Sequence, residues 1–454
     1  MAGELRETPY GLFAADFVKD PLANLCDPEG GIQTGPFGSQ LHQEDYVQIG
    51  TPIVTVEHLG ENRILHEGVP RVSDADRDRL ARYMLRKGDI VFSRVGSVDR
   101  RALVRDEEDG WMFSGRCLRV RPDPTKIDSQ YLSYFFGLPS FKEHIRAIAV
   151  GATMPSLNTS LLSDVVIPHP SGIHEQRAIA HILGTLDDKI ELNRRMSETL
   201  ESVARALFKS WFVDFDPVRN KIEIRDEIVP KRNADLFPNL LKNSEIGEIP
   251  AGWKVGTFGD LVEVLRDQEN PLESPDTWFR HFSIPAFDDG RWPKEELGKS
   301  IKSLKLRVPP GVVLLSKLNP EIERVWLVDV LPSERAVCST EFLVLHPRPP
   351  AGRAFAYCLA RSPVFRQQLE GLVTGTSKSH QRAQAASIIG LPVVRPEAAP
   401  VEMFELKAGP LLDRTLKCLR ESQALTALRD ALLPRLISGR LRVKDAAKLV
   451  ASVV

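Results

Sequence analysis

Few residues of this chain stand at the spacings that catalysis requires. His174-Glu175 would begin an H-E-x-x-H zinc motif, but Ala178 occupies the position of the second histidine, and the other histidines show no metal-ligand spacing. Gly298-Lys299-Ser300 matches the end of a phosphate-binding loop, but Pro293 stands where the first glycine of that loop is required. We therefore expect no metal site and no phosphate-binding loop.

Two further catalytic signatures are missing from the sequence. No two glycines are separated by a single residue, which excludes the G-x-G loops that bind dinucleotides or S-adenosylmethionine. Asn319-Pro320 is followed by Glu321 and Ile322 rather than by the aromatic-rich loop with which amino-methyltransferases hold a flipped base. We expect no catalytic residue and no cofactor in this chain.

Two basic segments instead offer binding chemistry. Basic residues outnumber acidic ones from Arg82 to Arg121 and again from Lys299 to Val325. Such residues around a glycine-bounded strand suit contacts to phosphates and to base edges. A solvated charged face is the alternative interpretation, but a basic residue, Arg94 or Lys317, follows the same strand in both segments. Loops rich in hydroxyl groups begin at Gly151 and Gly375, and they could bind an anion or merely form turns.

The elements that carry these residues occur twice along the chain. Five pairs of segments align in the same order with a nearly constant offset, which chance does not explain, and the repeat is too long for a solenoid unit. The pairs are 85–94 with 308–317, 113–122 with 338–347, 131–141 with 355–365, 151–168 with 375–392 and 186–207 with 412–433.

Each copy changes its periodicity from strand-like to helical. Apolar β-type runs such as 52–56 and 117–120 are bounded by glycine or proline, whereas the apolar residues of 179–211 and 412–436 recur every three or four positions. We predict an α+β fold, a tandem duplication of a mixed α/β domain plus a long helix. The two long helices are expected to pair antiparallel as a spacer; alternatively, each packs only on its own domain.

The periodicity also sets the expected domain bounds. Residues 214–250 are polar, contain four prolines and show no periodicity, which is typical of a linker. The expected parts are a first mixed domain at 1–170, its helix at 171–213, the linker at 214–250, a second mixed domain at 251–396, its helix at 397–440 and a tail at 441–454.

Length and composition are those of an ordinary globular protein. The 454 residues exceed what one hydrophobic core usually supports, 42% are hydrophobic, and 60 Lys and Arg stand against 61 Asp and Glu. The five cysteines are dispersed without a C-x-x-C pair, which predicts reduced thiols. Because the sequence shows neither a leader-like start nor 18 consecutive apolar residues, we expect a cytoplasmic protein.

Several blocks of the sequence resemble the specificity subunits of type I restriction-modification systems. They cover nearly the whole chain, and the helix blocks, such as Leu-Phe-Lys-Ser-Trp-Phe at 207–212, are the most specific. The blocks lie at 35–41, 87–93, 175–177, 186–190, 207–217, 247–253 and 432–439.

This resemblance implies a function in phage defence. Each mixed domain would be a target recognition domain that reads one half of a split, asymmetric double-stranded DNA sequence, and the helix pair would set the gap between the halves. The helices would dock two modification (methyltransferase) subunits and, through them, restriction (motor-nuclease) subunits. S-adenosylmethionine, ATP and Mg²⁺ are expected on those partners and not on this chain.

The resemblance also points to candidate site residues. In the second copy Val401-Glu402-Met403 replaces the block that begins at Glu175, so we expect less regular docking there. The residues expected to bind partner subunits are Glu175, Gln176, Arg177, Phe208, Trp211, Phe212 and Leu436. Those expected to face DNA are Gln33, Thr34, Ser39, Arg94, Ser97, Arg100, Arg101, Thr153, Ser156, Lys317, Asn319, Arg324, Thr376, Lys378 and Ser379.

Three alternatives stay open at this point. The chain could be a similar recognition subunit of a methylation-only or other phage-defence complex without a nuclease. It could be a duplicated enzyme with an unrecognised site between its two domains. It could also be a structural scaffold, which would show no salt-dependent affinity for duplex DNA.

Overall fold

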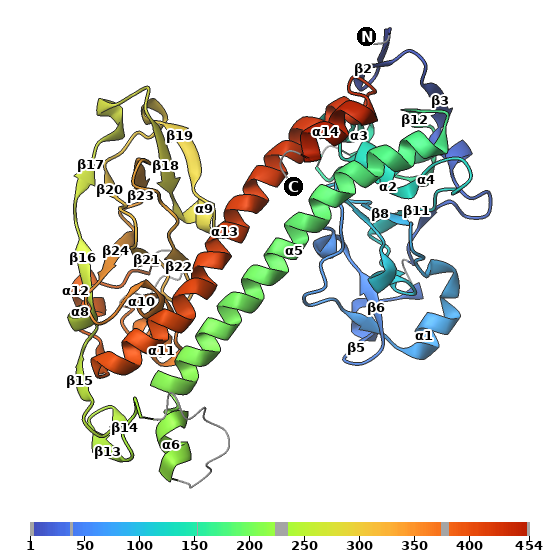
Figure 1. The fold of residues 1–454 in the computed structure, drawn as a ribbon. Coiled ribbons are helices and arrows are strands. Elements are labelled where there is room, and N and C mark those ends of the chain that lie inside the picture. The colour runs from blue at the N-terminus through green and yellow to red at the C-terminus, as the bar shows by residue number, and fades with distance from the viewer. Residues whose placement is uncertain (1–3, 37–39, 152, 223–234, 374–380, 452–454) are drawn as a thin grey trace. The chain divides into compact units, whose positions relative to one another are not determined.

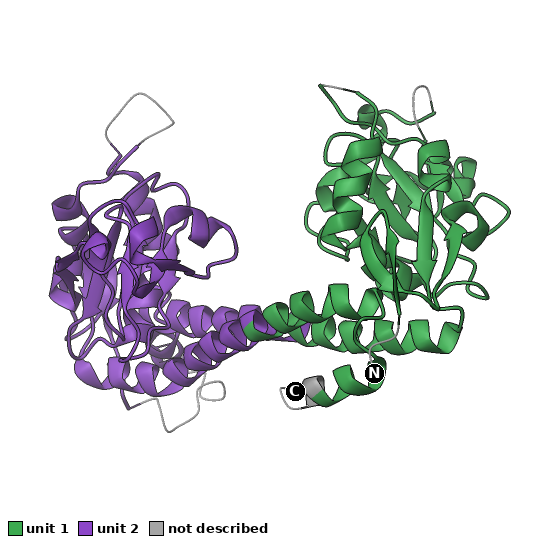
Figure 2. Ribbon diagram, turned by 90° about the horizontal axis from the view of Figure 1, so that it is seen from above, with its two compact units in different colours: residues 1–190, 424–454 green, residues 191–423 purple. Residues whose placement is uncertain are grey.

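A computed structural model describes residues 4–36, 40–151, 153–222, 235–373 and 381–451 of the chain. The chain forms two compact units, of which unit 1 comprises residues 1–190 and 424–454 and unit 2 comprises residues 191–423 (Figure 2). Both units combine helices and strands, as the predicted α+β class requires. No helix in the described part of the chain combines the length and the apolarity needed to cross a membrane.

The central sheet of unit 1 is antiparallel and covered on both faces. Ile90 and Phe92 point into one apolar core, whereas Val91 between them points into another. A strand buried on both faces is apolar throughout, which explains the continuous run in the sequence. The strand order is β4 (Ile32–Thr34), β11 (Cys117–Val120), β8 (Ile90–Ser93) and β9 (Arg101–Leu103).

Further strands and short helices complete unit 1 (Figure 1). A second sheet has the order β10 (Met112–Phe113), β6 (Thr51–Val54), β7 (Arg71–Val72) and β5 (Tyr46–Val47). Two-stranded pairs are formed by β1 (Leu5–Thr8) with β2 (Gly11–Ala14) and by β3 (Val18–Pro21) with β12 (Val166–His169). The short helices are α1 (Asp74–Arg79), α2 (Ser129–Phe136), α3 (Pro139–Ile148) and α4 (Thr159–Ser163).

Unit 2 repeats this plan with a different second sheet. Its central sheet has the order β16 (Val262–Leu265), β24 (Phe342–Pro347), β21 (Val313–Ser316) and β22 (Val325–Leu327). The second sheet has the order β17 (Gln268–Glu269), β20 (Lys305–Arg307), β23 (Ala336–Cys338), β18 (Trp278–Phe282) and β19 (Lys294–Leu297). Strand β15 (Lys254–Thr257) pairs with β25 (Pro392–Arg395), and the short helices are α8 (Phe258–Leu261), α9 (Ile284–Asp288), α10 (Arg353–Ala360), α11 (Pro363–Glu370) and α12 (Ala385–Ile389).

The duplication predicted from the sequence is confirmed. The central sheets share one strand order, and α2 and α3 recur as α10 and α11 at the aligned positions. The second sheets differ in strand number and order. Because those sheets include the segments between the aligned blocks, the copies share a framework but present different surfaces.

Two long helices, α5 (Ile173–Phe212) and α13 (Ala398–Ile437), pair antiparallel, as predicted. In unit 1, Leu186 near the start of α5 shares a core with Leu432 near the end of α13. In unit 2, Phe208 near the end of α5 shares a core with Phe404 near the start of α13. The helices therefore pack on each other as well as on the mixed domains, so the alternative in which each helix packs only on its own domain is wrong.

The segment predicted as a linker is folded at both of its ends. It contains α6 (Asp216–Ile222), β13 (Leu241–Ser244) and β14 (Gly247–Pro250), and only 223–234 lie outside the described residues. The β13–β14 hairpin matches β1–β2, because Ser244 Oγ donates to the Gly247 carbonyl (2.6 Å) as Thr8 Oγ1 does to that of Gly11 (2.7 Å). This hairpin thus begins the second copy. The predicted tail likewise contains α14 (Val443–Ala451).

Candidate nucleic-acid interface

Two loops that the sequence analysis singled out separately lie against each other in unit 1. The loop after β8 begins at Arg94, whose carbonyl accepts a hydrogen bond from the amide of Leu157 (2.9 Å). The amide of Gly96 donates to the carbonyl of Pro155 (2.9 Å). This contact fixes one loop on the other and leaves hydroxyl groups at the surface. The predicted residues that it brings together are Arg94, Ser97, Thr153 and Ser156.

Unit 2 contains the same loop pair. The carbonyl of Lys317 accepts from the amide of Ala383 (3.0 Å), and the amide of Asn319 donates to the carbonyl of Gln381 (2.8 Å). Asn319 adopts a left-handed backbone conformation (φ 47°), which asparagine tolerates better than most residues. The repeated contact places Lys317 and Asn319 where Arg94 and Gly96 lie in unit 1. Thr376, Lys378 and Ser379, like Ser39 in unit 1, lie outside the described residues.

Two predicted arginines are instead buried within their own unit. Arg101 is 2% exposed, with Nε donating to the Ser133 carbonyl (3.0 Å) and Nη1 to Glu61 (2.7 Å). Arg324 is 7% exposed and forms a two-pronged pair with Asp288 (2.8 and 2.9 Å). Their guanidinium groups stabilise local structure, so we do not retain these two residues as DNA contacts. Arg100 is half-buried and donates to the carbonyl of Leu59, as the half-buried Arg94 does to that of Gly115, and both stay predicted contacts.

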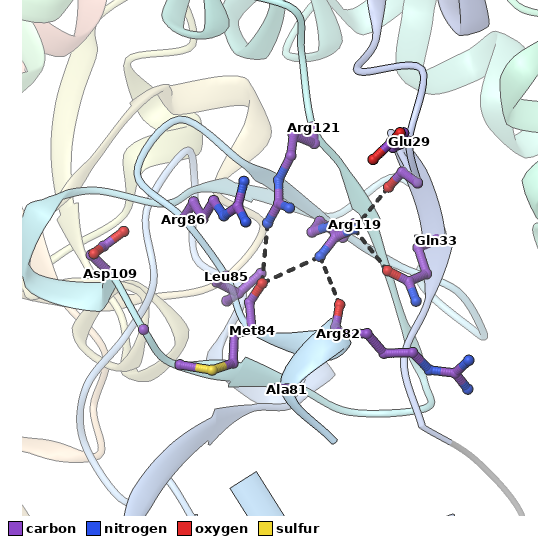
Figure 3. Close-up of a pocket in the computed structure, with 12 residues that line it drawn as sticks. Glu29, Gln33, Ala81, Arg82, Met84, Leu85, Arg86, Asp109, Arg119 and Arg121 are labelled. Carbon is purple, nitrogen blue, oxygen red and sulfur yellow. Dashed lines mark hydrogen bonds between the residues drawn. The ribbon is translucent and has the colours of Figure 1, made fainter. Parts of the chain in front are cut away.

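The polar strand β4 leads to a pocket that the sequence analysis missed. Gln33 Oε1 accepts from Arg119 Nη2 (2.7 Å), while Thr34 is half-buried on the same strand. Both Gln33 and Arg119 line a pocket of about 710 Å³, in which the guanidinium groups of Arg86, Arg119 and Arg121 gather (Figure 3). The acidic residues of its wall are Glu29 and Asp109.

Arg119 brings a buried positive charge to the wall of this pocket. Arg121 is neutralised by Asp89 through two hydrogen bonds (2.8 and 2.7 Å). The four oxygens that accept from Arg119, by contrast, are neutral carbonyl and amide oxygens. Burial, assisted by the charge of Arg121, lowers the pKa of Arg119 to about 10, so the side chain is still a cation at neutral pH. An anion entering the pocket would therefore be attracted.

The arginine at the centre of this pocket has no basic counterpart at the aligned position of unit 2. Arg119 aligns with Val344 on β24, which is buried in an apolar core of unit 2. The basic segment 82–121 could have indicated this pocket. From the sequence, however, Arg119 lies between the apolar Leu118 and Val120, and this alternation predicts a strand residue exposed to solvent. Only the fold shows that carbonyl oxygens from distant segments surround it.

The residues expected to bind partner subunits divide into exposed and internal ones. Arg177 is exposed, and the half-buried Glu175 pairs with Arg442 (3.3 Å). Gln176 is fully buried and accepts from the amide of Asp128 (2.8 Å). The remaining residues lie in the apolar cores of the units, so they do not form an exposed docking surface. They are Phe208, Trp211 and Phe212 in unit 2 and Leu436 in unit 1.

One group of described residues has the composition of a metal site. The potential ligand atoms of His66, Glu107 and Glu108 lie within 4.8 Å of one another. Glu108 is already engaged through both oxygens, because it accepts from the amide of Arg105 (2.7 Å) and is bonded to His66 (2.6 Å). This pairing accounts for the buried carboxylate without a metal ion.

The fold and the loop pairs define a duplicated protein built on two antiparallel helices, and comparisons with known proteins identify its relatives. The model of the type I restriction modification DNA specificity domain matches residues 38–202. The type I restriction enzyme MjaIX specificity subunit of Methanocaldococcus jannaschii is 26% identical over 97% of this chain and 97% of its own length. The HindI specificity subunit of Haemophilus influenzae is 24% identical over 84% of this chain and 92% of its own.

A solved structure shares the fold. The type I restriction-modification S subunit from M. genitalium superposes with a TM-score of 0.57 at 16% identity, over 92% of this chain and 96% of that one. The resemblance seen in the sequence is confirmed: over nearly its whole length, this chain is related to the specificity subunits of type I restriction-modification systems.

Proposed function

We propose that this chain is the non-catalytic, sequence-specific DNA-binding subunit of a type I restriction-modification complex. One observation carries the proposal: a chain related to specificity subunits places the same loop pair, with a basic residue at its start, in both of its copies. Arg94, Ser97, Arg100, Thr153 and Ser156 would face DNA in unit 1, and Lys317 and Asn319 in unit 2. Basic and hydroxyl side chains of this kind read base edges and hold phosphates.

The mixed domains within 1–170 and 251–396 would each read one half of a split, asymmetric sequence. Their second sheets differ, so two identical half-sites are not expected. The long helices at 171–213 and 397–440 would set the gap between the halves. The arginine pocket of unit 1 would add a phosphate contact through the exposed Arg86, with the buried charge of Arg119 behind it.

The same helices would dock two modification subunits, and restriction subunits would join through them in the cytoplasm. Arg177 and Glu175 are the accessible candidates for this contact. S-adenosylmethionine, ATP and Mg²⁺ would be bound by the partners. The residues beside the loop pairs bind and orient DNA and move no proton.

Mapping of modified bases tests this proposal. The chain is co-expressed with the modification subunits encoded beside it, and methylated adenines are mapped across the host genome by single-molecule sequencing. We expect one bipartite, asymmetric motif with a fixed gap that disappears when this chain is omitted. Absence of any motif that depends on the chain would refute the proposal and favour a scaffold or an unrecognised enzyme.

A further inference from the structure

An apolar pocket of about 180 Å³ lies in unit 2 at the C-terminal end of α5. Its walls come from α5, the β13–β14 hairpin, α10, α11 and β25. Val364 of α11 is 51% exposed and Glu248 of the hairpin is exposed, so the pocket is open to solvent at these residues. The side chains that form its apolar wall include Phe208, Phe212, Ile246, Phe365 and Val393.

Unit 1 shows what occupies the equivalent position. Its β1–β2 hairpin carries Tyr10 where the matching β13–β14 hairpin carries Ile246. The Tyr10 ring lies 5.2 Å from Phe135, 5.8 Å from Phe141 and 5.2 Å from His144 between ring centroids. In unit 1, therefore, an aromatic ring of the chain itself fills the space between the hairpin and helices α2 and α3.

Unit 2 lacks that ring but keeps much of the surrounding wall. Phe365 aligns with Phe141, and Ile246 is too short to replace a tyrosine ring at this position. An apolar cavity of about 150 Å³ is known to be large enough for benzene. The pocket of unit 2 is therefore large enough for one aromatic ring.

Gln368 aligns with His144, whose ring contacts Tyr10 edge-on in unit 1, and it lines the pocket of unit 2. A polar side chain therefore stands at the same place beside the ring position in both units. An aromatic ring is the group that this wall surrounds in unit 1, so an aromatic side chain also fits the wall in unit 2.

We propose that this pocket receives an aromatic side chain from a modification subunit. The inference rests on the proposed function, in which such subunits dock on the long helices. It also gives a role to Phe208 and Phe212, which are too buried to form a docking surface but which shape this pocket. Unit 1 is filled by its own Tyr10, so the two copies would hold their modification subunits differently.

Two substitutions and one matched control test the inference in the assembled complex. Ile246→Tyr fills the pocket from within, as Tyr10 does in unit 1, and Val364→Lys places a charge at its exposed rim. Ser140→Lys changes the aligned position of unit 1, where the pocket is already filled. Each variant is titrated with purified modification subunits, and the number bound is counted by mass photometry, with circular dichroism as the check of folding.

We expect the first two variants to bind one of the two modification subunits at least about tenfold more weakly, as loss of a central aromatic contact does, and Ser140→Lys to bind both normally. If all variants bind two subunits like the unmodified chain, the pocket proposal is overturned while the proposed function stands. If the unmodified chain binds no modification subunit, both the pocket proposal and the proposed function are overturned. If the substitutions instead abolish self-association of the isolated chain, the occupant is a second copy and the proposal is wrong.

Discussion

The arginine residues of unit 1 differ in the groups with which their guanidiniums interact. Arg101 donates hydrogen bonds to the carbonyl of Ser133 and to the carboxylate of Glu61. Arg121 forms an ion pair with the buried Asp89. Arg119 is 2% exposed and donates to neutral oxygens rather than to a carboxylate. The sequence shows only that these positions are basic, because the partners of each guanidinium lie far away along the chain.

Arg86 tests the phosphate contact at the pocket. Arg86→Ala removes an exposed cation beside Arg119, so affinity for duplex DNA should fall by a similar factor for all sequences, and the slope of log affinity against log salt should become shallower by about 1. Fluorescence anisotropy over a salt series measures both. Arg77→Ala, which removes a guanidinium already paired with Asp74 and Asp78, is the control and should leave the slope unchanged. An unchanged slope for Arg86→Ala would exclude the pocket from the interface.

A variant of Arg101 tests whether this residue stabilises the fold or contacts DNA. Arg101→Met leaves the buried Ser133 carbonyl without this donor, so the free energy of unfolding should drop by about 1–3 kcal/mol. The recognised DNA motif should not change, because the guanidinium points into the unit. Urea denaturation and adenine mapping provide the two measurements. A relaxed motif with normal stability would restore Arg101 to the DNA interface.

At the scale of elements, the two copies cap equivalent helices by different means. In unit 1, Asp128 caps α2 and accepts from the amide of Tyr131 (2.9 Å). In unit 2 the aligned residue is Gly352, which has no side chain, and Glu405 of α13 instead accepts from three amides at the start of α10, including that of Phe355 (2.6 Å). The start of α10 is therefore hydrogen-bonded to the long helix α13.

Glu405 should make stability depend on pH. Burial is the largest influence and raises its pKa above the usual 4.5, although the amides oppose this shift. The folded state thus binds this proton more tightly than the unfolded state, and the contribution of Glu405 to stability falls as pH rises from 4.5 through the raised pKa. Glu405→Gln should therefore gain stability relative to the unmodified chain as pH increases over that window, measured by urea denaturation at several pH values. A pH-independent difference would contradict this assignment.

The long elements could be predicted from the sequence, whereas the short ones could not. Periodicity over many turns predicts α5 and α13, and an apolar run between glycine and a basic residue predicts β8 and β21. The β13–β14 hairpin has four-residue strands and follows a proline-rich stretch, so no periodicity could develop. The same limit applies to the site: Arg94 and Ser156 could be proposed from composition, but their contact depends on backbone hydrogen bonds between distant loops.

At the scale of the whole molecule, each unit draws on distant parts of the sequence. Unit 1 includes the end of α13, and the amide of Ala14 in β2 donates to the carbonyl of Ser438 just beyond that helix (2.8 Å). In unit 2 the equivalent hairpin packs near the end of α5, where Ile249 and Phe212 share a core. Each mixed domain therefore packs against one end of α5 and one end of α13, and its first hairpin lies near the end of the long helix that precedes or follows it in the repeat.

The central claim is that each copy reads its own half of one DNA site, and adenine mapping of two variants tests it most directly. Arg94→Ala in unit 1 and Lys317→Ala in unit 2 are each co-expressed with the modification subunits, with Lys126→Ala at an exposed site as the control. We predict that each variant relaxes or weakens only one half of the bipartite motif, a different half for each, and that the control leaves both halves intact. Changes in the same half for both variants, or in neither half, would contradict the account.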